Sequence, residues 1–192
     1  ETYETLTEGV SSLLESGQHN KIQFINLAIL ENTAMAEPAY QQQYGLVVRE
    51  VRVTPHHTGL GDGVMEESQL LVLGTRTMPE EKWVAARVFC WMITLLHFDK
   101  LLQIPFILLN RISGASYRDI MEAFLSGDKR YPCIERIHAF FWEKAIDIQN
   151  GGSECVSSPE WLNIWWPPDE FIFIRLCRSG ELAMFYEEAE AL

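Results

Sequence analysis

The sequence lacks the cysteine spacing of a metal or cluster site. Its four cysteines, Cys90, Cys133, Cys155 and Cys177, lie far apart, and no CxxC, CxxxCxxC or Cys/His ligand pair occurs. This spacing argues against a zinc or iron–sulfur site built by this chain alone. Cys90 and Cys177 lie within apolar runs, which is typical of buried, reduced thiols in a cytosolic protein. We therefore expect no metal ligands in this chain and a cytoplasmic location.

Positive charge and long apolar runs are also scarce. The net charge is −12, with 15 Lys and Arg against 27 Asp and Glu. Such a chain repels phosphate backbones, and its basic residues occur at most as pairs, so we expect no nucleic-acid partner. The longest apolar stretch, Trp83 to Leu96, is interrupted by Arg87. It falls short of the roughly 18 uninterrupted apolar residues of a membrane helix, so we expect no membrane partner either.

Signatures of a complete catalytic centre are missing as well. The GLGDG at positions 59–63 lacks the spacing of a phosphate-binding loop, and neither GxSxG nor HExxH occurs. His56 and His57 lie on the same glycine-bearing loop. Adjacent side chains on an extended backbone point apart, which disfavours joint metal ligation. The remaining alternatives are contact with a substrate and a solvated loop, and the solvated loop is the simpler one. The motifs predict no catalytic residue in this chain.

The first 30 residues have the pattern of one helix followed by one buried strand. Apolar residues recur at helical spacing over Thr5–Ser16, and Gly17 follows as a stop signal. The run Lys21–Leu30 is apolar at most positions and rich in β-branched residues, which predicts a strand buried on both faces of a sheet. One such unit cannot form a sheet alone. We therefore expect its partners elsewhere, or self-association through residues 22–30.

The rest of the chain predicts a hairpin and then helices. Residues 46–53 and 68–75 are rich in Val and Leu and flank a loop with three glycines, which indicates a β-hairpin. A capping box at Thr77–Glu80 predicts the start of a long helix. Leu101–Leu109 is apolar on all sides, with Pro105 starting or kinking a helix, and further helices begin at Ser116 and Pro132. An aromatic helix is predicted from Ser158, with Trp161, Trp165 and Trp166 on one stripe. The last two predicted helices cover residues 169–178 and 181–192.

These elements predict an α+β fold that is predominantly helical. It consists of an N-terminal helix–strand unit, a β-hairpin and a multi-helix C-terminal domain. The change from α/β to helical character places a domain boundary near Gly45. The predicted domains are therefore residues 1–45 and residues 46–192.

One long stretch resembles the end of the catalytic barrel in radical-SAM enzymes. It is QFINLAILENTAMAEPAYQQQYGL, Gln23 to Leu46, in which a strand runs into an Asn-Thr-x-Met turn and an acidic Pro-Tyr segment. The region after it, with VLGTRTM at 72–78, Glu80 to Trp83 and a Phe-Tyr-Glu-Glu tail at 185–188, is similar to the region after the barrel in the cobalamin-domain-bearing subgroup. The family's CxxxCxxC triad and its cobalamin-ligating motif are absent from this chain.

The resemblance implies a C-terminal, substrate-shaping region of a radical-SAM enzyme. The helix–strand unit would then be the remnant of an α/β barrel, and the partner would be the N-terminal catalytic barrel of the same protein. That protein would use S-adenosylmethionine, a [4Fe–4S] cluster and, in this subgroup, cobalamin, none of them bound by this segment alone. Because ligands of parallel barrels lie at the C-terminal ends of the strands, the resemblance makes Asn26, Glu31 and Asn32 candidate cofactor-binding residues. Strand-end and turn capping is their alternative role.

A second function remains open from a different class. In this alternative the chain is a freestanding helical protein-interaction module without catalytic activity. The partner of the module binds the aromatic face around Trp161 to Trp166. An upstream CxxxCxxC in the same reading frame favours the radical-SAM interpretation, whereas a start codon just before Glu1 favours the interaction module.

Overall fold

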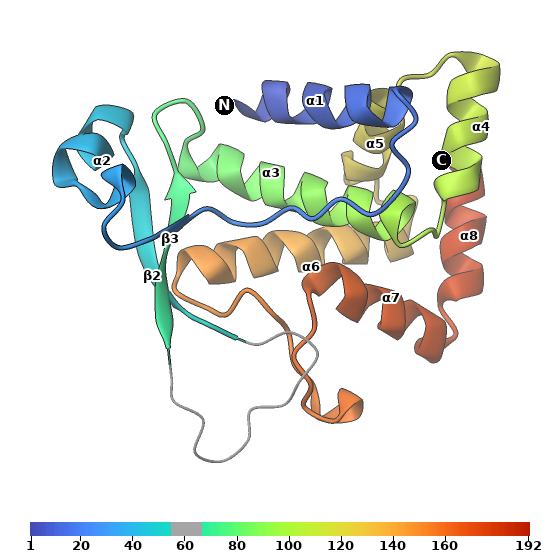
Figure 1. Cartoon of the computed structure of the whole chain (residues 1–192). Coiled ribbons are helices and arrows are strands. Elements are labelled where there is room, and N and C mark those ends of the chain that lie inside the picture. Colours follow the sequence, from blue (N-terminus) through green and yellow to red (C-terminus); the bar gives the residue numbers. More distant parts are fainter. Residues whose placement is uncertain (55–66) are drawn as a thin grey trace.

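The fold is organised around one buried helix, α3. The computed structural model describes residues 1–54 and 67–192 (Figure 1). Helix α3 (Glu80–Ile93) buries nine of its residues and continues into a π-helical turn, Thr94–Phe98. Four other helices contact α3: α1 (Tyr3–Glu15), α5 (Tyr117–Leu125), α6 (Pro132–Gln149) and α7 (Pro168–Ser179). The longest apolar run of the sequence, Trp83 to Leu96, therefore lies at the centre of the core.

A small antiparallel sheet covers one end of α3. Its strands are β1 (Ala28–Ile29), β2 (Val47–Arg52) and β3 (Ser68–Gly74), and their order is β1–β3–β2. The predicted hairpin is confirmed, because β2 and β3 pair antiparallel with Val51 opposite Gln69. The short helix α2 (Pro38–Tyr44) precedes β2 and ends at Gly45, whose φ of 59° is a left-handed conformation that favours glycine.

The remaining helices complete the opposite end of the molecule. These are α4 (Gln103–Ser113), which contacts α5, and α8 (Leu182–Ala191), which lies beside α7 in Figure 1. Ser116 caps α5 by accepting a hydrogen bond from the Asp119 N–H, and Pro132 starts α6, as their sequence signals predict. The predominantly helical α+β class is thereby confirmed, whereas the division at residue 45 stays a prediction.

The prediction of a strand over residues 21–30 is wrong for most of that range. Only Ala28 and Ile29 form a strand, and they pair antiparallel with β3 at the edge of the sheet. The prediction of burial on both faces fails as well, since Ile25 is 82% exposed. The physical reason is that a strand needs a hydrogen-bonding partner along its whole length. The chain comes alongside β3 only at residues 27–29, so residues 21–26 have no strand to pair with.

Three helix predictions need correction. No side-chain capping bond starts α3, because Pro79 occupies its N-cap and the Thr77 hydroxyl instead donates to the Glu1 carbonyl. Helix α4 is packed on one face only, which leaves Ile112 81% exposed. The aromatic helix is a single 3₁₀ turn, Pro159–Trp161, because the residues after it, Leu162 and Asn163, adopt left-handed backbone angles.

Two predictions about burial have opposite outcomes. Six apolar residues that recur at helical spacing in the sequence are all buried, as that spacing predicts: Val84, Trp91, Leu95, Phe124, Ile137 and Phe141. Of the two cysteines expected in the interior, Cys90 is buried but Cys177 is exposed, because it lies on the outer side of α7.

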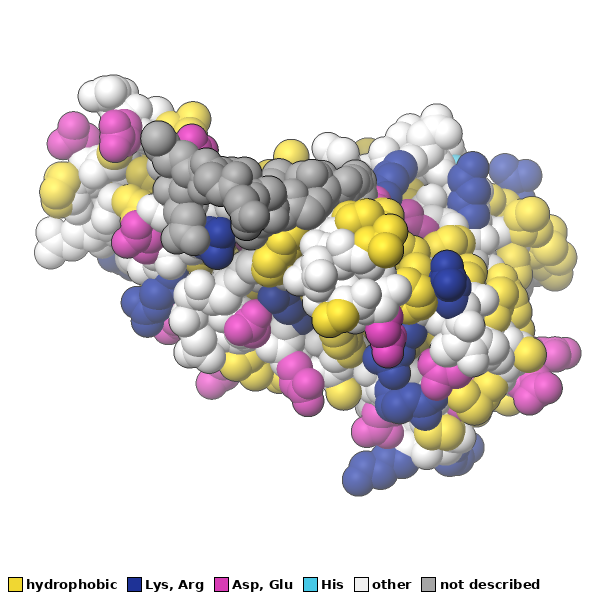
Figure 2. All heavy atoms as spheres, turned by 90° about the horizontal axis from the view of Figure 1, so that it is seen from below, with side chains coloured by type: hydrophobic (Ala, Val, Ile, Leu, Met, Phe, Trp, Pro, Cys, Tyr) yellow, Lys and Arg dark blue, Asp and Glu magenta, His cyan; other side chains and the backbone are white. Residues whose placement is uncertain are grey.

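In the part of the chain that the structure describes, no one helix has the length and apolar character needed to cross a membrane. The helical stretches Glu80–Phe98 and Gln103–Ser113 meet that requirement only as a pair, with a bend of 92° between them. The face drawn in Figure 2 carries apolar side chains interspersed with acidic and basic ones.

Candidate functional site

Residues 21–27, here called the strap, cross the molecule alongside α3 between α1 and the sheet (Figure 1). The strap has no regular secondary structure, yet its burial alternates: positions 22, 24 and 26 are covered and positions 21, 23, 25 and 27 are exposed. This is the period of an extended chain with one covered face. The covered positions are Ile22, Phe24 and Asn26, so an amide side chain occupies the third inward-facing position.

Two cavities flank the strap and share its residues Phe24, Ile25 and Asn26. The apolar cavity has a volume of about 680 Å³ and lies between the strap, α2, β3 and the first turns of α3. The polar cavity has a volume of about 630 Å³ and lies between the strap, α3 and the start of α7. Both volumes are in the range of small-molecule binding sites. Arg87 lines both of them.

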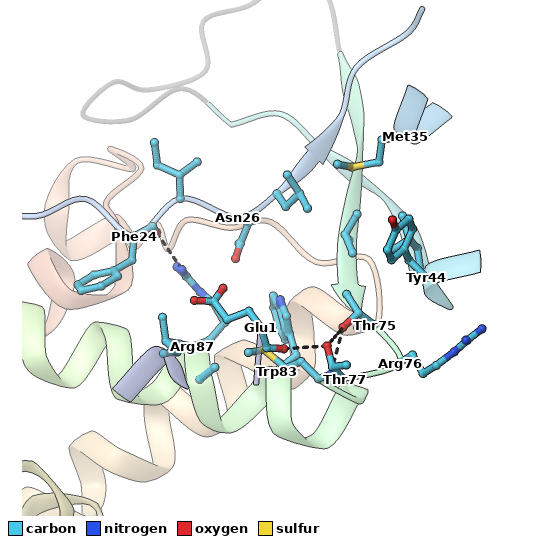
Figure 3. A pocket seen from close by; sticks show the side chains of 18 of the residues that line it. Glu1, Phe24, Asn26, Met35, Tyr44, Thr75, Arg76, Thr77, Trp83 and Arg87 are labelled. Atoms are coloured by element: carbon cyan, nitrogen blue, oxygen red, sulfur yellow. Dashed lines mark hydrogen bonds between the residues drawn. The ribbon is translucent and has the colours of Figure 1, made fainter. Parts of the chain in front are cut away.

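The side chains around the apolar cavity are arranged asymmetrically (Figure 3). Asn26 and Arg87 lie at one end, and Met35 and Tyr44 lie at the other. The wall between them is formed by apolar side chains that include Leu27, Val72, Met78 and Trp83. Arg76 also contributes to the lining, but its side chain extends away from the cavity in Figure 3 and donates to the Gln42 carbonyl. Arg87 is therefore the cationic side chain that faces this cavity, and Thr75 and Thr77 add hydroxyl groups to its lining.

Arg87 is the charged residue at the centre of the site. Its Nη1 donates to the Phe24 carbonyl at 2.8 Å, and its guanidinium lies over the Trp91 ring, 4.6 Å from the centroid. Its Nε is buried without a hydrogen-bond partner, and the guanidinium makes no ion pair with any described residue. Burial lowers the pKa of Arg87, but guanidinium groups stay protonated in proteins. The site thus contains a half-buried positive charge with a buried Nε and no carboxylate bonded to it.

Glu154, a carboxylate whose charge acts on Arg87, is bonded to other groups. Glu154 accepts a hydrogen bond from Asn26 Nδ2 through one oxygen and from Gln69 Nε2, at 2.7 Å, through the other. These bonds join the strap, β3 and the segment before α7. With both oxygens bonded to amides, Glu154 acts on Arg87 only through its longer-range field.

The polar cavity contains a carboxyl group that titrates near neutrality. Asp169, at the start of α7, is 6% exposed. Burial and the neighbouring Asp99 raise its pKa to about 7. Asp99 itself, whose pKa is raised by burial, accepts a 3.1 Å bond from Lys21, which also bonds Glu170. A carboxyl with such a pKa on a cavity wall can exchange a proton with a bound molecule at neutral pH.

A buried histidine pair holds the chain where the strap begins. His19 Nδ1 lies 3.1 Å from Nε2 of His97, which is 0% exposed. Burial and the proximity of His19 lower the pKa of His97 to about 4, so it is neutral at physiological pH. The Gln103 side chain also links the two histidines, because its Nε2 donates to the backbone carbonyls of His19 and His97. The strap is therefore fixed at one end by this cluster and at the other by β3.

The structure separates the residues that the resemblance implied. Asn26 lines both cavities, whereas Glu31 and Asn32 lie in an exposed turn after β1, with Asn32 at a left-handed φ of 62°. His56 and His57 lie outside the described residues. None of these assignments is tested, and all stay predictions.

Sequence reasoning missed Arg87, Gln69, Glu154 and Asp169. Arg87 did carry a signal, because it is the one charge within an otherwise apolar run of a core helix. The other three had none, since they come from segments far apart in the sequence.

Metal-binding groups do not gather anywhere in the described residues. Within residues 1–54 and 67–192, no cluster of three or more His, Cys, Asp or Glu side chains has the arrangement of a metal site. Burial raises the pKa of Cys90 and of Cys155 to about 12, which opposes the thiolate form that metals require. These residues do not fit an iron–sulfur cluster.

Comparison with known proteins gives one informative similarity. The chain is 30% identical over 122 residues to a cobalamin-dependent radical SAM methyltransferase, TokK of Streptomyces tokunonensis. The alignment covers 64% of this chain but 18% of that enzyme, so the chain matches less than a fifth of the relative's length. No family model matches the chain. The similarity supports a relationship to radical-SAM proteins.

Proposed function

We propose that this chain is a substrate-shaping region that works with a radical-SAM catalytic barrel. The observation that carries the proposal is the similarity over 122 residues to a cobalamin-dependent radical SAM methyltransferase. The two cavities beside the strap support it, because each has the volume of a small-molecule site. The described residues form no cluster site, so the iron–sulfur chemistry belongs to the barrel.

The proposed role of this chain is to bind and orient a substrate. Asn26 is held in place by Glu154, and Arg87 is held by the Phe24 carbonyl, so both polar groups are fixed before a ligand arrives. Preorganised groups of this kind reduce the cost of ordering a ligand. Asp169 adds a group that can hold or release a proton in the neighbouring cavity.

The proposed partner surface is the outer face of the strap and β1. Ile25, Leu27 and Leu30 are 82%, 50% and 67% exposed, and β1 is an edge strand with open backbone groups. Exposed apolar edges of this kind pair with another chain or sheet. We place the catalytic barrel of the same protein there, and self-association through residues 22–30 is what we expect of the chain without it.

Iron content and hydrogen exchange test the proposal together. The complete polypeptide that carries these residues, purified without oxygen with any tightly bound partner, should contain about four iron atoms, and these 192 residues alone should contain none. In the complete protein the amides of residues 24–30 should exchange at least tenfold more slowly than in the isolated chain, while those of α6 serve as the control. A complete protein without iron, or with unchanged exchange at the strap, would contradict the proposal.

A second candidate function is supported by a separate observation. On α4 the residues Ile104, Leu108 and Ile112 lie at helical spacing and are 69%, 50% and 81% exposed. Such a stripe is typical of a helix that packs on a partner protein. This observation favours an interaction module without catalytic activity. If this function is correct, the complete polypeptide contains no iron. It also binds a partner protein through α4, and the Ile112→Glu substitution in α4 abolishes that binding.

A further inference from the structure

We propose that the apolar cavity binds a small monocarboxylic acid, with the carboxylate on Arg87 and the hydrocarbon part against Leu27, Val72 and Trp83. The substrate interpretation of this ligand rests on the proposed function, whereas the binding itself does not.

The guanidinium of Arg87 has the correct free edge for a carboxylate. Nε–H and Nη2–H point in the same direction on a guanidinium, and together they match the two oxygens of a carboxylate. In this structure Nη1 is the bonded nitrogen, on the Phe24 carbonyl, and Nε is buried without a partner. Nη2 makes no hydrogen bond with the described residues either. The edge that a carboxylate needs is therefore unused.

No carboxylate of a described residue lies within ion-pair distance of the Arg87 guanidinium. A buried guanidinium nitrogen without a partner is destabilising, so the unpaired Nε indicates that another molecule provides the opposite charge. Glu154 is kept away by its bonds to Asn26 and Gln69. Asp169 is the other carboxyl whose field reaches Arg87, and it is half-protonated near pH 7 because its pKa is raised. Stacking on Trp91 holds the guanidinium plane but does not neutralise the charge.

The charges on each side of the strap decide which cavity receives the anion. The polar cavity is lined by Glu154, Asp169 and Glu170, with Lys21 already bound to two carboxylates, so an anion there is repelled. The apolar cavity offers Arg87 at one end and hydrocarbon along the wall, and Glu1 is the one acidic residue among the described residues of its lining. A molecule that matches both the charge of Arg87 and the apolar wall is an acid with an apolar body. The volume of the apolar cavity, about 680 Å³, limits that body to the size of a small molecule.

The test compares an acid with its neutral isostere on the full 192-residue chain. 4-Phenylbutanoate and 4-phenylbutanamide are titrated into ¹⁵N-labelled protein at pH 7.5. We expect the acid to bind at least tenfold more tightly, because a charge-assisted bidentate pair is lost in the amide. We also expect the Nε–H resonance of Arg87 to shift with the acid alone. Equal affinities for acid and amide, or no binding by either at 10 mM, would overturn the proposal.

Two variants locate the effect. Arg87→Met should bind acid and amide equally, with the amide affinity unchanged if the cavity is intact. Arg76→Met is the matched control, since Arg76 lines the same cavity but points away, and it should keep the preference for the acid. A preference that survives in Arg87→Met and disappears in Arg76→Met would overturn the assignment to Arg87. If Arg87→Met does not fold, the comparison in the unmodified protein decides. The assay contains no iron or S-adenosylmethionine, so it fails or succeeds independently of the proposed function.

Discussion

Replacing Asp169 by Asn should stabilise the protein above neutral pH and leave it unchanged in acid. Asp169 is buried beside Asp99, and both effects raise its pKa to about 7 from the 3.8 of an unfolded Asp. Between these two values the folded protein keeps a proton that the unfolded chain has released. Stability is therefore fully present below about pH 4, falls as the pH rises to about 7, and is constant above that.

The size of the effect follows from the difference between the two pKa values. About three units at 1.36 kcal/mol per unit correspond to a loss of at most roughly 4 kcal/mol. Asn mimics the protonated carboxyl at every pH, so Asp169→Asn should avoid this loss. At pH 8 the variant should be more stable than the unmodified protein by up to about 4 kcal/mol. At pH 4 the two should agree to within about 0.5 kcal/mol.

Urea unfolding at pH 4, 6 and 8 measures these differences. Glu143→Gln is the matched control, because it removes the same charge from an exposed position on α6. Titrating groups that do not interact with Asp169 or Glu143 act equally in all three proteins and cancel in the comparison. A difference between Asp169→Asn and the unmodified protein that is the same at pH 4 and pH 8 would refute a bound proton on Asp169.

Three further predictions concern the core, the histidine pair and the strap. Trp91→Ala should cost roughly 3–5 kcal/mol in the free energy of unfolding, because Trp91 is 4% exposed, whereas Trp142→Ala at a 39% exposed position should cost about 1 kcal/mol or less. His97→Gln should remove the gain in stability that occurs as the pH rises from about 4 to 6.5, since the folded pKa of His97 is lowered to about 4; an unchanged acid slope in urea unfolding would contradict this. In the dilute isolated chain, the amides of Phe24–Leu30 should exchange well before those of Val84–Ile93, and added protection of the strap at high protein concentration would reveal self-association through it.

Local patterns in the sequence predicted the helices well. The apolar spacing of α6 and the Pro at its start depend only on residues within the helix, and its inward-facing residues Ile137 and Phe141 are buried as predicted. The hairpin is equally local, because a glycine-rich loop between two runs rich in Val and Leu needs no other part of the chain. Such elements are predictable because their stabilising contacts and their sequence signals lie close together.

Predictions failed where an element depends on what lies beside it. Helix α4 is as apolar as a buried helix, yet Ile104 and Ile112 are exposed because nothing in the described chain covers that face. The Trp spacing at 161–166 is helical, but Val156 pairs with Trp166 across a β-bridge and the chain turns back at Leu162 and Asn163. In both cases the composition was interpreted correctly as apolar, and the neighbour that decides the conformation was not visible in the sequence.

The candidate site shows the same limit in a form that concerns function. Its polar groups come from the strap, from β3, from α3 and from the segment before α7, so no spacing in the sequence announces them. What the sequence does reveal is each group's conflict with its local pattern: Asn26 occupies an inward-facing apolar position, and Arg87 interrupts a core helix. Each would be a destabilising choice alone, because an isolated buried amide or guanidinium costs free energy. The fold resolves the first conflict with Glu154 and leaves the second open at the cavity. A residue that breaks its local pattern and remains unsatisfied in the folded chain is the strongest indication of a ligand that this protein provides.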